Sequence, residues 1–281
     1  MNYRHIYHAG NFADVFKHII LMRVIAYLKQ KDKPFFGLDT HAGTGKYNLT
    51  SPQAHKTMEA AAGIGSLWNI SNLPPAIEAY LTLIRNTNPD ARKLTTYPGS
   101  PLIMKTLLRG ADRMVANELH PEDAHMLKKA LGEDSRVKVE NMDGYTCLKA
   151  FLPPDERRGV VLIDPPFEVT DEFERMVKGL RNAYTRWATG IYAFWYPIKS
   201  PADIHLFHQE IKALNIPRCV AFDFMLRPVS DPDVLNGCGM LLVNPPWTLR
   251  EEIEAIAPTL IYHMTDGIGA LRINEISGES V

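Results

Sequence analysis

A short segment near the middle of the chain places a carboxylate, two prolines and an aromatic ring directly after an apolar run. Residues 159–163 (GVVLI) predict a buried strand, and Asp164, Pro165, Pro166 and Phe167 follow it at once. The prolines end the strand because they cannot continue a sheet ladder. The Asp164 carboxylate and the Pro165 carbonyl can accept both hydrogens of an exocyclic amine, while Phe167 stacks on the ring that carries it. This trio suits methylation of a planar amine, and the alternative is an ordinary Pro-Pro turn.

A glycine-rich turn follows the first predicted strand, residues 35–39. Residues 40–46 (THAGTGK) would let the backbone approach a cofactor closely. The segment is not a phosphate-binding P-loop, because Tyr47 stands where that motif needs Ser or Thr. It is not a complete dinucleotide motif either, because Asn48 replaces the third glycine. The pattern Asp-x-His-Ala-Gly-x-Gly matches the first motif of S-adenosylmethionine-dependent methyltransferases.

Acidic residues also end the next two predicted strands. Glu118 ends the second and Asp143 follows the third, while Asp164 ends the fourth. Alternation of strands with helices predicts a parallel sheet, which collects these groups at one edge. Ligands of open α/β sheets bind at that edge. Glu118 can accept hydrogen bonds from both ribose hydroxyls of a nucleoside, and Asp143 can accept one from its adenine amino group. For either residue alone, the alternative is a solvated acidic turn.

The order of the elements predicts an α/β, Rossmann-like class I methyltransferase domain over residues 1–281, with a seven-stranded, mostly parallel sheet. In a plain Rossmann unit the second strand would follow about 20 residues after the first. Here the next convincing strand begins at Arg113, and two helical patterns lie between them. We therefore expect residues 48–97 to form a helical insertion subdomain within the domain. Such an insertion would carry substrate recognition or serve as a structural cap.

Asn244-Pro245-Pro246-Trp247 repeats the pattern of the Asp164 segment. Counted from Asp39, Asn244 ends the seventh predicted strand, which in the methyltransferase fold is antiparallel and ends away from the cofactor. We therefore expect a structural role for Asn244 and a catalytic one for Asp164.

The composition is that of an ordinary soluble protein, with 46% hydrophobic and 22% charged residues and a net charge of -1. No apolar run approaches the roughly 20 residues of a membrane span, and nothing suggests export, so we expect a cytoplasmic protein without membrane association. Cys147, Cys219 and Cys238 lie far apart, which argues against a zinc site or a disulfide framework. The N-terminal segment mixes aromatic and positively charged residues, suited either to contacting bases and phosphates or to packing on the core.

Seven segments together resemble the ribosomal RNA large-subunit methyltransferase J family, and the similarity runs from Tyr3 to Trp247. That family uses S-adenosylmethionine to methylate N6 of one adenine in 23S ribosomal RNA, and is also described as needed for using external DNA as a nutrient. The segments are Tyr3-Arg4-His5, His8-Ala9-Gly10-Asn11, Asp39-Thr40-His41-Ala42-Gly43, Tyr97-Pro98-Gly99-Ser100-Pro101, Glu118-Leu119-His120-Pro121, Asp164-Pro165-Pro166-Phe167 and Ala188-Thr189-Gly190-Ile191-Tyr192.

The resemblance implies roles for individual residues. Asp164 would be the proton acceptor in catalysis, and Pro165 and Phe167 would take part beside it. Tyr3 and Phe167 would face the substrate. Phe167 stands where many relatives have Tyr, which keeps the ring and loses one hydroxyl. The implied cofactor contacts are His18, His41, Ser100, Glu118, Asp143, Gly144 and Asp164.

The resulting hypothesis is direct in-line methyl transfer, without a metal, to a flipped-out adenine. We expect a monomer whose partner is 23S ribosomal RNA. The RNA would be free of protein or in an early stage of ribosome assembly. One alternative is another planar amine, in DNA adenine or a protein glutamine. Another is a catalytically silent module that only binds nucleic acid or nucleoside.

Overall fold

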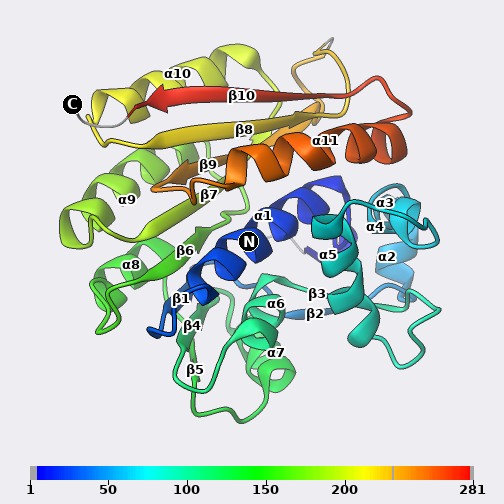
Figure 1. Ribbon diagram of the computed structural model, residues 1–281, viewed down its shortest axis with the longest axis horizontal. Helices are drawn as coiled ribbons and strands as arrows, with labels where there is room; N and C mark the ends of the chain where they lie inside the picture. Colours follow the sequence, from blue (N-terminus) through cyan, green and yellow to red (C-terminus); the bar gives the residue numbers. More distant parts are fainter. Residues whose placement is uncertain (1–4, 230, 279–281) are drawn as a thin grey trace.

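The computed structural model describes residues 5–229 and 231–278. These residues form an eight-stranded sheet in the order β10-β8-β9-β7-β6-β1-β4-β5, covered by helices on both faces (Figure 1). The strands of the sheet are β1 (Phe36–Asp39), β4 (Arg113–Asn117), β5 (Val137–Glu140), β6 (Gly159–Ile163), β7 (Ile191–Ile198), β8 (Cys219–Met225), β9 (Gly237–Val243) and β10 (Ala270–Ser277).

The predicted Rossmann-like, mostly parallel sheet is confirmed. β1 pairs in parallel with β4 and β6, and the parallel arrangement continues to β5 and β7. The carboxyl ends of these strands therefore meet at one edge, as the sequence predicts. β9 is antiparallel to both β7 and β8.

The prediction of seven strands was wrong, because β10 is an eighth strand, the outermost on one side of the sheet. It pairs antiparallel with β8. Leu271 and Ile273 pack against the core, while Arg272 between them is exposed. This alternation is the period-2 pattern of a half-buried strand. The polar residues of β10 interrupt this apolar pattern, so the strand is not recognised within an acidic terminal segment.

Two hydrophobic cores lie on the two faces of the sheet. Side chains of α1, α6, α7 and α11 belong to one core, and those of α8, α9 and α10 belong to the other. The bounds of these helices are α1 (Phe12–Lys29), α6 (Ser100–Leu107), α7 (Pro121–Leu131), α8 (Gly144–Phe151), α9 (Glu172–Arg186), α10 (Pro201–Ala213) and α11 (Leu249–Thr265). In the described residues, no helix has both the length and the apolarity needed to span a membrane.

Helix α1 lies across one face of the sheet (Figure 1). It is capped by Asn11, whose side chain accepts from the Asp14 N–H. A short 3-10 helix, η1 (His5–Tyr7), precedes it. Although α1 is mainly apolar, its first two turns bury Asp14, Lys17 and His18.

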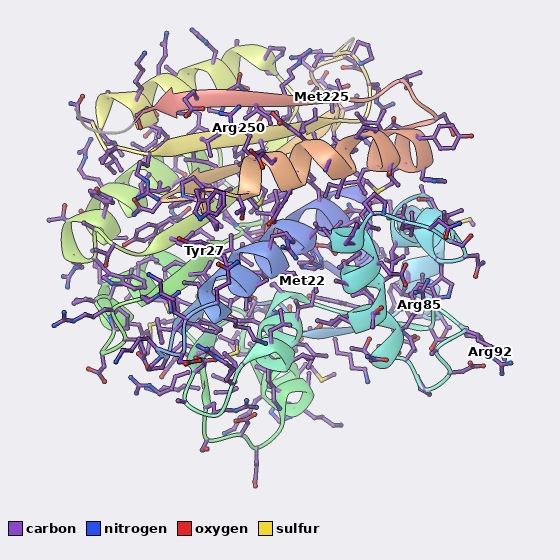
Figure 2. All side chains as sticks on the ribbon, in the orientation of Figure 1. Met22, Tyr27, Arg85, Arg92, Met225 and Arg250 are labelled. Atoms are coloured by element: carbon purple, nitrogen blue, oxygen red, sulfur yellow. The ribbon has the colours of Figure 1, made fainter. Side chains whose placement is uncertain are left out.

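The segment between β1 and β4 is mainly helical. An antiparallel pair, β2 (Lys46–Asn48) and β3 (Thr96–Pro98), lies at its base. Arg92 extends into solvent at its outer edge (Figure 2). Residues 48–97 as a separate insertion subdomain stay a prediction. The helices between β2 and β3 are α2 (Pro52–Thr57), α3 (Glu59–Ala62), α4 (Ile64–Leu67) and α5 (Pro75–Asn86).

Asn244 follows β9 and lies at the opposite edge of the sheet from Asp164, because β9 is antiparallel to β7. Its side-chain amide donates to the carbonyl oxygens of Ala188 and Gly190, both at 2.8 Å. Its φ of 55° lies in the left-handed region that asparagine tolerates. Asn244 therefore joins two loops at this edge.

We expect Asn244→Ala to lower the free energy of unfolding by about 2–3 kcal/mol, since it strips two carbonyls of their donor and strains the backbone. Urea unfolding measures this loss. Asn244→Gly removes the same bonds but tolerates the positive φ, so its loss should be about 1 kcal/mol smaller. Equal stability of Asn244→Ala and the unaltered protein would refute the structural role.

Candidate active site

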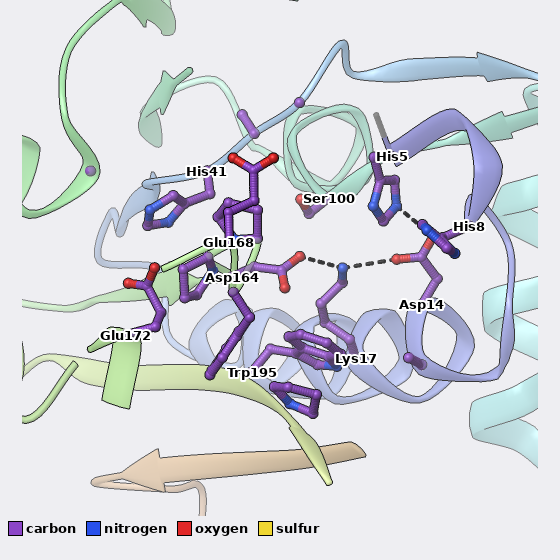
Figure 3. Close-up of a pocket in the computed structure, with 18 of the residues that line it drawn as sticks. His5, His8, Asp14, Lys17, His41, Ser100, Asp164, Glu168, Glu172 and Trp195 are labelled. Atoms are coloured by element: carbon purple, nitrogen blue, oxygen red, sulfur yellow. Dashed lines mark hydrogen bonds and ion pairs between the residues drawn. The ribbon is translucent and has the colours of Figure 1, made fainter. Parts of the chain in front are cut away.

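A cavity of about 430 Å³ opens at the carboxyl edge of the parallel strands, beside the first turns of α1 (Figure 3). Its lining includes eight of the residues predicted from the sequence, which lie far apart along the chain. Tyr3 lies outside the described residues, and His18 is not part of the lining. The eight are His41, Ser100, Glu118, Asp143, Gly144, Asp164, Pro165 and Phe167.

Lys17 links α1 to Asp164 on the loop after β6 (Figure 3). Its Nζ lies 2.5 Å from Asp164 Oδ2 and 2.8 Å from Asp14 Oδ1. Asp14 Oδ2 lies 2.9 Å from His5 Nε2 and accepts from the Gly10 N–H at 2.9 Å. The result is a chain of paired groups that runs from η1 through α1 to the Asp164 carboxylate.

The paired groups stabilise one another in their charged forms. Burial opposes the charged form of Lys17, but Asp14 and Asp164 outweigh it and raise the pKa of Lys17 well above its usual value. Burial also opposes ionisation of Asp14, yet His5 and Lys17 hold its pKa well below the usual range. Lys17 is therefore a permanent cation beside Asp164.

The sequence analysis gave no role to Lys17 or Asp14. Their signal was an acid and a base three residues apart, within the apolar positions of a helix. Charged residues are seldom buried unless they are paired, so such a pair on a core helix indicates a buried ionic site.

His18 lies on the same helix as Lys17 and is 1% exposed. Its Nδ1 lies 2.7 Å from the Tyr97 hydroxyl, which in turn lies 2.8 Å from the Tyr80 hydroxyl. Burial lowers the pKa of His18 to about 3, and the positive charge of Lys17 acts in the same direction. The ring is therefore neutral, and its Nε2 has no hydrogen-bond partner among the described residues.

Asp39, at the end of β1, is fully buried below the glycine-rich turn. Burial raises its pKa to about 7, an effect that the Ser100 hydroxyl opposes and the charge of Asp164 adds to. Burial also lowers the pKa of the neighbouring His41 to about 4. A Cβ on Gly144 would lie 2.6 Å from the His41 ring, so this ring requires a glycine beside it.

Glu118 braces the glycine-rich turn from the end of β4. Its carboxylate accepts from the N–H groups of Gly43 and His120, both at 2.9 Å. The preceding residue, Asn117, is fully buried and bonds the carbonyls of Thr40 and Met142, both at 2.9 Å. The loops after β1, β4 and β5 are therefore fixed to one another.

Asp143 caps α8 through its Oδ1, which accepts from the N–H groups of Tyr145 and Thr146. Its Oδ2 lies 2.8 Å from Arg175 Nη2 on α9. Arg175 also lies over the Tyr145 ring, 4.7 Å from the centroid. The sequence analysis missed Arg175, which lies on a helix with no motif around it.

Phe167 has a φ of 51°, a costly conformation for an aromatic residue. Its ring stands nearly edge-on to Trp195, with centroids 6.0 Å apart and an interplanar angle of 77°. The centroid of the Phe173 ring lies 5.0 Å from that of Phe167, also edge-on. The two cavity-lining rings, Phe167 and Trp195, form an aromatic corner beside Asp164. Trp195 is a further residue that the sequence analysis did not select.

Comparisons with known proteins identify the same family as the sequence motifs. The model of a family described as "Ribosomal RNA large subunit methyltransferase D, RlmJ" matches residues 32–276. A Haemophilus influenzae protein named Ribosomal RNA large subunit methyltransferase J is 41% identical over 280 residues, which are 99% of this chain and 100% of that protein. An Escherichia coli protein of the same name is 42% identical over 260 residues, 92% of each chain.

A crystal structure of a Legionella pneumophila protein has the same fold. It superimposes with a TM-score of 0.89 at 37% identity, covering 96% of this chain and 98% of that one. The similarity therefore extends over the whole domain rather than over the motifs alone.

The raised pKa of Asp39 predicts a pH dependence of stability. The folded protein keeps a proton on Asp39 up to about pH 7, whereas the unfolded chain releases it near its ordinary value of 3.8. This group therefore stabilises the fold below pH 4, and its contribution is lost as the pH rises toward 7, by about 1.4 kcal/mol per pH unit.

Urea unfolding of the unaltered protein and of Asp39→Asn at pH 5, 6 and 7 tests this. We expect the stability of Asp39→Asn relative to the unaltered protein to improve by about 1.4 kcal/mol per unit over this interval. The difference cancels the opposite pH dependence of the buried histidines His18 and His41. A constant difference across the interval would show that Asp39 is ionised in the folded protein.

Proposed function

The chain belongs to the ribosomal RNA large-subunit methyltransferase J family, and on this premise we propose that it transfers a methyl group from S-adenosylmethionine to N6 of an adenine in 23S ribosomal RNA. The observation that carries the proposal is the Asp164 carboxylate, held by buried Lys17 at the cavity wall beside Pro165 and Phe167. The names of the relatives supply the substrate, large-subunit ribosomal RNA.

The cavity suits the proposed cofactor, which is cationic at its sulfonium and ammonium groups. Acidic side chains outnumber lysines and arginines in its lining, and Gly43 lets the backbone come close. We assign the ribose hydroxyls to Glu118, the adenine to Asp143 and Gly144, and the remaining contacts to His41, Ser100 and Asp164. His18, which is buried outside the lining, receives no contact. When bound, S-adenosylmethionine supplies an electrophilic methyl group.

Asp164 prepares the amine for attack. Adenine N6 is a poor nucleophile because its lone pair is delocalised into the ring. Hydrogen bonds from its two hydrogens to Asp164 and to the Pro165 carbonyl favour a tetrahedral nitrogen with a localised lone pair, and they stabilise the positive charge that develops there. Lys17 occupies Asp164 Oδ2, which leaves Oδ1 to accept from the amine and then to take its proton.

The target base must leave its stack to reach this cavity, so the substrate is an unpaired RNA segment, free of protein or early in assembly. Phe167 provides the face on which the base stacks, and Tyr3, outside the described residues, is assigned to the substrate. We propose that the protein acts as a monomer.

A labelled-methyl assay tests the function. Unmodified 23S ribosomal RNA, DNA and total protein are offered in parallel with labelled S-adenosylmethionine, and mass spectrometry locates the product. We expect label in the RNA, as N6-methyladenine. Label in DNA adenine or in a protein glutamine would replace the proposed substrate, and a chain that binds no S-adenosylmethionine by calorimetry would be a binding module.

The role of Asp164 is tested by Asp164→Asn in single-turnover kinetics. The amide keeps the shape but removes the charge and the proton acceptor, so we expect the rate to fall at least about 100-fold. Asp155→Asn is the matched control, because Asp155 is exposed and pairs with Arg113 at the start of β4. A near-normal rate for Asp164→Asn would refute the assigned role.

A further inference from the structure

The cavity continues beyond the Asp164 loop onto an extension of β7. The last residue pair between β6 and β7 joins Ile163 to Phe194, whereas β7 stays paired with β9 as far as Ile198. The carboxyl end of β7 therefore projects past its neighbour, next to the loop that joins β8 to β9. Trp195, Pro197 and Lys199 of this extension and Leu235 of that loop line the cavity, and we call these four residues the β7 ledge.

The alternation of a strand explains why these residues share one face. Side chains two apart in a strand point to the same side, so Trp195 and Pro197 share one face, and Lys199, directly after the strand, continues their row along the cavity. Tyr196 and Ile198, between them, are buried in the core on the other side of the sheet. The row begins at the aromatic corner with Phe167 and ends at an exposed ammonium group.

The backbone of the ledge is fixed by Asn236, which is fully buried. Its amide donates to the carbonyl oxygens of Lys199, Asp231 and Val234, at 3.2, 2.8 and 3.0 Å. Its N–H donates to the Ile198 carbonyl at 2.9 Å. Lys199 thus extends from a rigid base rather than from a free loop.

Lys199 differs from the other cationic side chains of the lining. Lys17 is paired with Asp14 and Asp164, and Arg175 with Asp143. Lys199 forms no ion pair with any residue that the structure describes. The rest of the lining is rich in carboxylates, which repel phosphate, so the ledge is the part of the cavity where a phosphate is favoured.

We propose that the β7 ledge binds single-stranded RNA next to the flipped base, with Lys199 contacting a backbone phosphate of the target nucleotide. The inference rests on the proposed function, because it takes the methylated base to lie at Asp164 and Phe167. The RNA strand then leaves the cavity over the end of β7, along the loop between β8 and β9. Phosphate contacts of this kind fix the register of a nucleic acid without reading its sequence.

Lys199→Ala tests the ledge, with Lys212→Ala as the matched control. Lys212 is also exposed, but it lies near the end of α10, which runs from the ledge back to the opposite edge of the sheet. Filter binding of an unmodified 23S ribosomal RNA transcript at several salt concentrations gives the affinity and the number of phosphate contacts. Steady-state methylation gives KM and kcat, and calorimetry gives the affinity for S-adenosylmethionine.

For Lys199→Ala we expect a threefold to tenfold weaker RNA affinity and a matching rise in KM, the size of one exposed ionic contact. The slope of log affinity against log salt should fall in magnitude by about 0.7, the value for one phosphate of a single strand. The kcat at saturating RNA, the cofactor affinity and all values for Lys212→Ala should stay unchanged.

Unchanged RNA affinity in Lys199→Ala, or an equal loss in Lys212→Ala, would overturn the assignment of the ledge. These outcomes are distinct from failure of the proposed function, in which the unaltered protein itself transfers no methyl group to RNA. Lys199→Arg keeps the charge and should bind RNA as the unaltered protein does.

Discussion

The ion pair between Lys17 and Asp164 is the interaction on which the site depends. A buried ammonium group and a carboxylate are costly to remove from water, and each is tolerated because the other is there. Asp14 supplies a second negative charge on the other side of Lys17 and is itself bound to His5 and to the Gly10 backbone. The Asp164 carboxylate, the first turns of α1 and the segment before it are therefore one electrostatic unit. The buried apolar residues of α1 hold the helix against the sheet, and this unit fixes its first turns at the cavity.

The same local sequence serves two purposes in this protein, and the direction of the strand before it decides which. Asp164 follows a parallel strand and lies at the cavity, whereas Asn244 follows an antiparallel strand and binds the loop that holds Ala188 and Gly190 at the far edge. A Pro-Pro turn after a strand is therefore a way of fixing a side chain at the edge of a sheet. What that side chain does depends on the groups collected at the same edge.

Sequence reasoning located the parts of the site that follow a strand, because strand order alone places them. Glu118, Asp143 and Asp164 were found in this way, and all three line the cavity. Lys17 was not found, since its partner Asp164 is 147 residues away and nothing local reveals the pairing. Arg175 and Trp195 lie on regular elements without a motif, so only the packing of those elements brings them to the cavity. β10 was missed because polar residues interrupt its apolar ones: Arg272 and Glu275 are exposed, and of its eight residues only Ile276 is buried.

The long separation between Lys17 and Asp164 also bears on the order in which the chain can fold. During synthesis α1 leaves the ribosome well before β6, so Lys17 emerges long before the carboxylate beside which it is finally buried. Until β6 has joined the sheet, docking of α1 would bury an ammonium group that lacks one of its two carboxylates. We therefore expect stable docking of α1 only after β6 has joined the sheet, so that the cavity wall at Lys17 and Asp164 is completed by the same event.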